Sequence, residues 1–88
     1  MGREDKTVLT RYTVTLVYAD MNDHTRAFHD LFAADLFVRR SKEKPGVMRI
    51  IVYEVKTDEN GILSRSIVNR KVLSVWQRTR GGWTCRFQ

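Results

Sequence analysis

Hydrophobic and polar residues alternate with a period of two in the segment VLTRYTVTLVYA, residues 8 to 19. The larger apolar and aromatic side chains fall on one side, and the polar ones on the other: Tyr12, Val14, Leu16 and Tyr18 against Arg11, Thr13 and Thr15. This period is typical of a strand with one buried face. We therefore expect a half-buried strand whose threonine side meets solvent.

The next segment changes to a helical period. At 100° per residue, one broad arc collects most of its apolar side chains: Ala27, Phe28, Leu31, Phe32, Ala34, Leu36 and Val38. Asn22 or Asp23 can cap the first free amides, so the pattern predicts a helix of about four turns beginning near residue 23. Asp35 lies on the apolar arc. Alternatively, it marks an early end of the helix, with LFVRRS turning into a strand.

Residues 41 to 46, SKEKPG, predict a loop, because Pro45 cannot continue a helix and Gly46 frees the backbone. The β-branched run VMRIIVYEV, residues 47 to 55, predicts a central strand. If its inward positions are Met48, Ile50 and Val52, then its outward positions are Arg49, Ile51 and Tyr53. That strand would thus present a tyrosine and an arginine on the exposed side of the sheet.

The remaining residues predict strands joined by turns. Asn60–Gly61 suits a tight hairpin turn, residues 62 to 68 read as the return strand, and residues 69 to 71 read as a turn or bulge. Residues 72 to 79 and 83 to 87 form a last hairpin, with a two-residue loop at either Arg80–Gly81 or Gly81–Gly82. Both loops place the same residues on one aromatic face: Trp76, Arg78, Trp83, Cys85 and Phe87. We expect this face to pack on the helix, against Phe28 and Phe32.

These elements predict one α+β domain over residues 1–88, with residues 1–7 as a flexible tail. The expected architecture is a single amphipathic helix packed on a curved antiparallel sheet of about five strands. The expected order is a β-α-β-β-β-β roll, cystatin-like or nuclear transport factor 2-like in outline.

The net charge of +6 is uneven along the chain. Residues 1 to 44 hold eight Lys and Arg against seven Asp and Glu, whereas residues 45 to 88 hold eight against three. Six of the latter eight cations are arginine, whose planar fork suits phosphate and carboxylate. The basic C-terminal half therefore indicates a polyanionic partner.

Other features of the composition indicate the cellular compartment that we expect for the protein. Cys85 is the only cysteine, which excludes an internal disulfide and favours a cytoplasmic setting. No apolar run approaches the roughly 18 residues needed to cross a bilayer, so we expect no membrane partner.

The candidate binding residues fall in two groups. Arg49, Tyr53 and Arg86 would share the exposed face of the sheet, where cations hold phosphates and an aromatic ring stacks an unpaired base. A second basic cluster, Arg39, Arg40, Lys42 and Lys44, would add an anion-binding edge. The competing interpretation is an ordinary solvated sheet, with the second cluster complementing the negative end of the helix dipole.

Catalysis and metal binding are not expected. His24 and His29 are five residues apart, about 140° on a helix, so they cannot both hold one ion. Phosphate-binding glycine loops and nucleophile motifs are absent from the sequence, and Cys85 beside tryptophans would be inert. Asp35, if desolvated, is the one candidate acid or base, although such a residue is more often paired or at a helix end. We expect no enzyme, no cofactor and no metal.

The terminal segment VLSVWQRTRGGWTCRF resembles the closing hairpin of nuclear transport factor 2-like domains. Those domains have more N-terminal helices than this chain provides, so their pocket and catalytic acid do not transfer. The order strand, helix, PGVMRI, glycine turn and final Trp–Cys strand is also similar to small phage-encoded anti-CRISPR proteins of roll-like fold. That resemblance implies a protein that blocks a nucleic-acid-handling complex by occupying its surface.

The function expected from the sequence is a small basic binding module that docks to nucleic acid or to a nucleic-acid-handling assembly. A protein-binding inhibitor or accessory factor of phage or mobile-element type, as a monomer or a homodimer, is the alternative. A miniature nuclear transport factor 2-like domain that binds a small molecule is a third, and it requires a cavity lined by Asp35.

Overall fold

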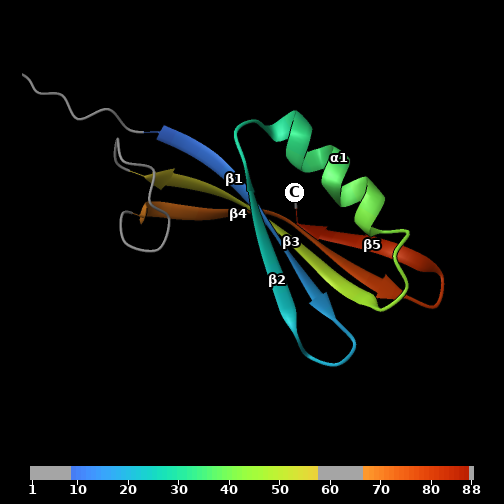
Figure 1. The fold of residues 1–88 in the computed structure, drawn as a ribbon. Coiled ribbons are helices and arrows are strands. Elements are labelled where there is room, and N and C mark those ends of the chain that lie inside the picture. The colour runs from blue at the N-terminus through green and yellow to red at the C-terminus, as the bar shows by residue number, and fades with distance from the viewer. Residues whose placement is uncertain (1–8, 58–66, 88) are drawn as a thin grey trace, which may run out of the picture.

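The computed structural model describes residues 9–57 and 67–87, as one helix packed on a five-stranded antiparallel sheet (Figure 1). The elements are β1 (Leu9–Tyr18), β2 (Asp23–Phe28), α1 (Leu31–Ser41), β3 (Val47–Thr57), β4 (Ile67–Thr79) and β5 (Gly82–Phe87). The strands lie in the order β2-β1-β3-β4-β5. The predicted class, an α+β fold with one helix on a curved sheet of about five strands, is confirmed.

The predicted start of the helix is wrong. Residues 23 to 28 form the edge strand β2, which pairs with β1 and shares a 2.8 Å hydrogen bond between the Thr15 and Thr25 hydroxyls. The helix begins after Asp30, whose Oδ1 accepts a 2.8 Å hydrogen bond from the Ala33 amide. The order is therefore β-β-α-β-β-β, because a hairpin occupies the positions given to the first helical turns.

The buried strip of α1 also differs from the predicted arc. Ala34, Val38 and Ser41 are buried, whereas Phe32 is 74% exposed. The predicted arc included Phe32 because Ala27 and Phe28 were counted as helical, but both belong to β2. The alternative of an early end at Asp35 is wrong as well, since α1 runs through Ser41.

The main core lies between α1 and the centre of the sheet. Its buried members are Val14, Leu16, Ala34, Val38, Val47, Ile50 and Val52. Val47 is fully buried instead of Met48, because a register shift between Val17 and Tyr18 displaces the inward positions of β3 by one residue. The helix packs most closely on β1, β2 and β3, and its backbone lies farther from β4 and β5.

The terminal hairpin turns at Arg80–Gly81, one of the two predicted loops, since Thr79 pairs with Gly82. Trp76 and Trp83 pack against the core, as predicted for this face. Their predicted partners are wrong, however: Phe28 pairs with Phe37 on α1 at 5.2 Å between ring centroids, and Phe32 is exposed.

The loop between α1 and β3 covers the two tryptophans instead. The Trp83 Nε1 donates to the Lys42 carbonyl at 3.1 Å, and the Lys42 ammonium lies 3.2 Å from the centroid of the Trp76 ring. Arg78 donates through Nε to the Val47 carbonyl at 2.8 Å and through a terminal nitrogen to the Lys44 carbonyl at 3.0 Å. Its guanidinium also lies 4.7 Å from the Trp83 ring centroid. The aromatic end of the hairpin is thus a structural clamp on this loop.

The strand β4 runs without a break through residues 69 to 71, so the turn alternative predicted there is wrong, and the irregularities of the strand lie on either side of these residues. The extra residues are absorbed by register shifts between Val52 and Tyr53 and between Lys56 and Thr57. The predicted Asn60–Gly61 turn, the first part of the return strand and the N-terminal tail lie outside the described residues.

Candidate functional site

The sheet face opposite α1, called the outer face below, is the candidate binding surface. Strand register places side chains of all five strands there, including Arg11, Thr13, Thr15, Val17, Asp23, Arg49, Ile51, Tyr53, Val55, Arg70, Val72, Val75, Gln77, Thr84 and Arg86. No described element packs over this face (Figure 1). Side chains on the outer face are therefore held in place by the sheet and are accessible to a partner.

The charge on the outer face is strongly one-sided. Four arginines come from four adjacent strands, one each from β1, β3, β4 and β5: Arg11, Arg49, Arg70 and Arg86. Asp23, at the β2 margin opposite Val17, is the only acidic residue among the described positions of this face. Like charges on one surface sum to a positive potential that attracts anions.

Arginine and tyrosine side chains stack near the centre of the outer face. The guanidinium carbon of Arg70 lies 4.9 Å from the centroid of the Tyr53 ring. Val55, which pairs with both Arg11 and Arg70, is only 2% exposed although it lies outside the main core. We attribute this burial to the apolar stems of the arginines, which cover the strand while their charged ends reach solvent.

Thr13 was expected to be solvent-exposed on this face, and that expectation is wrong. Its side chain is on the predicted side of β1, but it is only 6% exposed. Its cross-strand neighbours are Ala27 and Tyr53, and a tyrosine beside a short side chain shields it from water. Thr13 therefore offers little to a partner, and the hollow on this face lies on the part formed by β3, β4 and β5.

A shallow hollow occupies that part of the face. Its lining residues are Arg49, Val72, Val75, Gln77 and Arg86, and its volume is about 430 Å³. Val72 and Val75 supply an apolar floor, and the Arg49 Nε donates a 3.2 Å hydrogen bond to the Gln77 Oε1. We call this feature the valine hollow. It combines an apolar surface with two cations and one amide, the mixture that suits a flat polar ring with a nearby anion.

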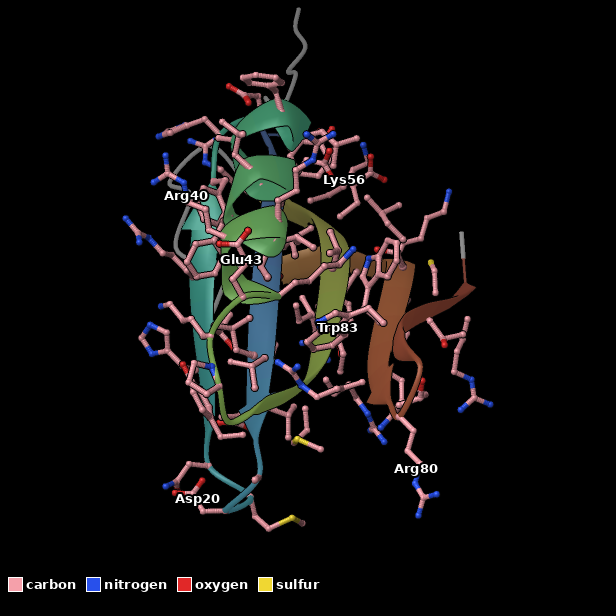
Figure 2. All side chains as sticks on the ribbon, turned by 90° about the vertical axis from the view of Figure 1, so that its right-hand side faces the viewer. Asp20, Arg40, Glu43, Lys56, Arg80 and Trp83 are labelled. Carbon is pink, nitrogen blue, oxygen red and sulfur yellow. The ribbon has the colours of Figure 1, made fainter. Side chains whose placement is uncertain are left out.

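The structure separates the seven residues predicted to bind. Arg49, Tyr53 and Arg86 share the outer face, as the strand alternation predicted. Arg39, Arg40, Lys42 and Lys44 belong to the helix side of the sheet, on α1 and the loop after it. Figure 2 shows Arg40 projecting from α1, on the other margin of the molecule from Arg80. The two groups therefore do not form one continuous surface through the hollow.

Several helix-end cations have contacts of their own. Arg39 and Arg40 lie in the last turn of α1, where they complement the helix dipole, and Arg39 is 4.0 Å from Asp35. Lys42 rests on Trp76, and burial lowers the pKa of its ammonium. Lys44 lies beside Tyr18 and the β1–β2 turn.

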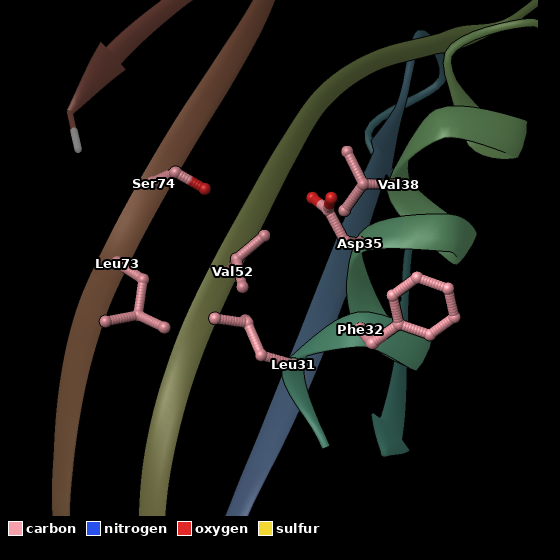
Figure 3. A pocket seen from close by; sticks show the side chains of 7 residues that line it. All are labelled: Leu31, Phe32, Asp35, Val38, Val52, Leu73 and Ser74. Atoms are coloured by element: carbon pink, nitrogen blue, oxygen red, sulfur yellow. The ribbon is translucent and has the colours of Figure 1, made fainter. Parts of the chain in front are cut away.

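A second recess lies between α1 and the strands β3 and β4, called the helix groove below. It has a volume of about 430 Å³ and is lined by Leu31, Phe32, Asp35, Val38, Val52, Leu73 and Ser74. Figure 3 shows side chains from the helix and both strands converging on it. The Asp35 side chain is 63% exposed and faces Arg39, so it is not the desolvated carboxylate that a catalytic role would use.

Two further features bear on the chemistry. Across residues 9–57 and 67–87 there is no group of three or more His, Cys, Asp or Glu residues placed to hold a metal ion. His24 is exposed on β2 rather than on a helix, and His29 is exposed just before α1. In the same residues, no helix has the length and apolar character that a membrane span requires.

The sequence pattern did not reveal several residues of the outer face. Arg70 and Val72 join it because β4 continues through residues 69 to 71 and bulges opposite Val52 and Tyr53, whereas Val75 follows from the strand alternation. A turn or bulge at residues 69 to 71, as predicted, gives Arg70 no defined side. Strand alternation puts Gln77 on the side opposite the predicted aromatic face, but its hydrogen bond to Arg49 depends on the register between β3 and β4.

Comparison with protein-family models, with curated proteins and with solved structures found no match to this chain. We therefore infer a function from the charge, the hollow and the groove themselves.

Proposed function

We propose that this protein binds single-stranded nucleic acid on the outer face of its sheet. The observation that carries the proposal is four arginines on four adjacent strands, as one pair near Tyr53 (Arg11 and Arg70) and one pair at the valine hollow (Arg49 and Arg86). Arg11 and Arg70 both lie opposite Val55, six residues along β3 from Arg49, so at about 3.3 Å per residue the two pairs are about 20 Å apart along the strands. A polyanion that runs along the strands can meet both pairs.

Arginine is well suited to this role. Its guanidinium donates two parallel hydrogen bonds to a phosphate, and its planar surface also stacks on a base. Among the described residues, neither a hydrogen bond nor an ion pair engages the exposed Arg86 side chain. Arg49 is bound to the neutral Gln77 and so keeps its net charge for a ligand.

The apolar part of the outer face favours an unpaired strand over a duplex. Bases in a duplex are stacked inside the helix, whereas unpaired bases can lie on aromatic rings or guanidinium planes. The Arg70 guanidinium on Tyr53 offers such a plane, and Val72 and Val75 offer an apolar surface nearby. Each base stacked in this way contributes about 1–3 kcal/mol to binding.

The salt dependence of binding tests this proposal. We expect fluorescence anisotropy with a labelled single-stranded oligonucleotide to show an affinity that falls linearly with salt on a double-logarithmic plot. Arg49→Gln or Arg86→Gln removes one phosphate contact, and each is expected to reduce the slope by about 0.7. Arg40→Gln is the matched control, because it removes the same charge from an exposed position on α1.

Two results would contradict the proposal. One is an affinity that does not change with salt. The other is a slope that Arg40→Gln reduces as much as Arg86→Gln does, since that would indicate attraction by net charge without a preferred face.

The helix groove favours a second candidate function, docking to a protein. Phe32, Leu31 and Leu36 are all exposed on α1, and such apolar side chains on a small protein often mark an interface. This function corresponds to the inhibitor or accessory factor that the sequence also suggested, and a second copy of the chain is the simplest partner to test. Phe32→Gln should then convert a dimer to a monomer in size-exclusion chromatography with light scattering. A monomeric wild-type protein at high concentration would reject the homodimer.

A further inference from the structure

The valine hollow contains hydrogen-bond donors arranged around an apolar floor. Arg49 and Arg86 can only donate hydrogen bonds through their side chains. The Gln77 carbonyl oxygen already accepts from Arg49, so the amide nitrogen of Gln77 points the other way and is also a donor. The polar groups that a ligand meets there are therefore mainly donors.

The four bases differ in what they offer to such a site. Guanine and uracil or thymine carry a keto oxygen, an acceptor, at the position where adenine and cytosine carry an amino group, a donor. An amino group that faces the Gln77 amide nitrogen brings two donors together and leaves both without a partner. A keto oxygen at the same position receives a hydrogen bond instead.

We propose that the valine hollow holds one unpaired base of a single-stranded nucleic acid and selects keto bases over amino bases. The base lies on Val72 and Val75, the Gln77 amide nitrogen donates to the keto oxygen, and Arg86 binds the adjacent phosphate. The proposal rests on the proposed binding of single strands by the outer face, and adds a chemical preference within it.

Oligo-uridine and oligo-cytidine of equal length are the probes, because uracil and cytosine have the same size and differ in the keto and amino groups. We expect the wild-type protein to bind oligo-uridine about three- to tenfold more tightly, the range that one hydrogen bond provides. Oligo-inosine against oligo-adenosine repeats the comparison with purines. The salt slopes for the two members of each pair should be equal, because the phosphates are the same.

Variants of Gln77 separate base selection from binding. Gln77→Ala is expected to bring the ratio of the two affinities to about one with the salt slope unchanged. Gln77→Glu replaces the donor by an acceptor of similar shape, and should shift the ratio toward oligo-cytidine. Thr84→Ala is the matched control, since Thr84 is exposed opposite Gln77 but does not line the hollow.

The outcomes distinguish the two proposals. Salt-dependent binding with equal affinity for uridine and cytidine strands would overturn the keto selection and leave the proposed function standing. A preference that persists in Gln77→Ala would also overturn it. Absence of binding to any single strand would overturn both. Circular dichroism of each variant confirms the fold before these affinities are compared.

Discussion

Met21 has a backbone conformation that suits glycine better than methionine. Its φ is 76°, the only positive value at a non-glycine residue in the described ranges. It lies in the turn between β1 and β2, where its side chain is 83% exposed and buries little apolar surface. Side chains with a Cβ pay a steric cost in the left-handed region, and glycine does not.

We therefore expect Met21→Gly to increase the free energy of unfolding by about 0.5–1 kcal/mol, measured by urea denaturation. Met21→Ala keeps the Cβ and should change stability much less. A loss of stability in the glycine variant, with the alanine variant unchanged, would show that the entropy that glycine adds to the unfolded chain outweighs the steric cost of the Cβ.

Lys42 links a single side chain to the pH dependence of folding. Burial lowers the pKa of its ammonium below the ordinary value of 10.5. The unfolded chain then binds a proton more tightly than the folded one in the interval just below 10.5, so the contribution of Lys42 to stability rises with pH through that interval. Below the folded-state pKa, both states are protonated and the destabilising contribution is constant.

The expected measurement compares wild type with Lys42→Met in urea at about pH 8 and about pH 10, a range that covers the alkaline interval. The stability difference between the two proteins should change in favour of the wild type as pH rises. Taking the difference cancels the other groups that titrate there. A constant difference, or a change toward the variant, would mean that the Trp76 ring under the ammonium holds the charged form more strongly than burial disfavours it.

The loop between α1 and β3 depends on a residue of another element. Arg78 on β4 donates to carbonyls of Val47 and Lys44, and its guanidinium lies over the Trp83 ring. These carbonyls lie in the loop after the helix and at the first residue of β3, and the Lys44 carbonyl also accepts a hydrogen bond from the Val47 amide at 3.4 Å. Through Arg78, the strand β4 thereby fixes the position of the loop that follows α1.

Arg78→Met keeps the apolar stem and removes the donors, and we expect it to lower the free energy of unfolding by about 1.5–3 kcal/mol, the range for hydrogen bonds to a charged group. Arg80→Met removes a similar side chain from the exposed hairpin turn and should change stability by less than about 0.5 kcal/mol. Equal effects of the two variants in urea denaturation would contradict the role of Arg78 as a clamp.

Strands with clear alternation were predictable, and the first helix boundary was not. Val14 and Leu16 mark β1, and the run at Ile50 marks β3 at the centre of the sheet, as the structure confirms. The prediction for residues 23 to 28 was wrong because an edge strand needs only the backbone groups of one neighbouring strand and one shielded side. Its sequence therefore shows little alternation of apolar and polar residues. All residues of β2 are exposed except Phe28, so Ala27 and Phe28 could be counted with the helix that follows.

The residues of the outer face were predictable in part, because strand alternation fixes the side of a residue only where the strand is regular. Parity along one strand placed Arg49 and Tyr53 on the same side, and parity across the terminal turn placed Arg86. Parity fails at a bulge, however, and the shift opposite Val52 and Tyr53 decides where Arg70 and Val72 lie. A pattern of apolar and polar residues does not reveal such shifts. The binding roles of these residues stay predictions.

At the scale of the whole molecule, the two faces of the sheet have different tasks. One face carries α1, the clamped loop and the main core. The other carries the arginines and the valine hollow, and its groups contribute little to that core. Substitutions on the outer face can therefore change binding without unfolding the protein.

A ligand that binds only the folded state also stabilises it. With single-stranded oligonucleotide at a hundred times its Kd, the added stability is about 2.7 kcal/mol, and we expect a corresponding rise in Tm by differential scanning calorimetry at low salt. The rise should be smaller in Arg86→Gln and should disappear at high salt as phosphate contacts weaken. A Tm that oligonucleotide leaves unchanged at low salt would argue against binding to the folded state.

The clamp on the loop has a consequence for how the molecule folds. The Val47 carbonyl and its donor Arg78 are 31 residues apart in the chain, and the Lys42 carbonyl and its donor Trp83 are 41 apart. Closing the chain between such distant partners costs conformational entropy before the hydrogen bond can form, and contacts of this kind slow folding. The end of α1 therefore acquires its final surroundings late, when the terminal tryptophan strand has joined the sheet.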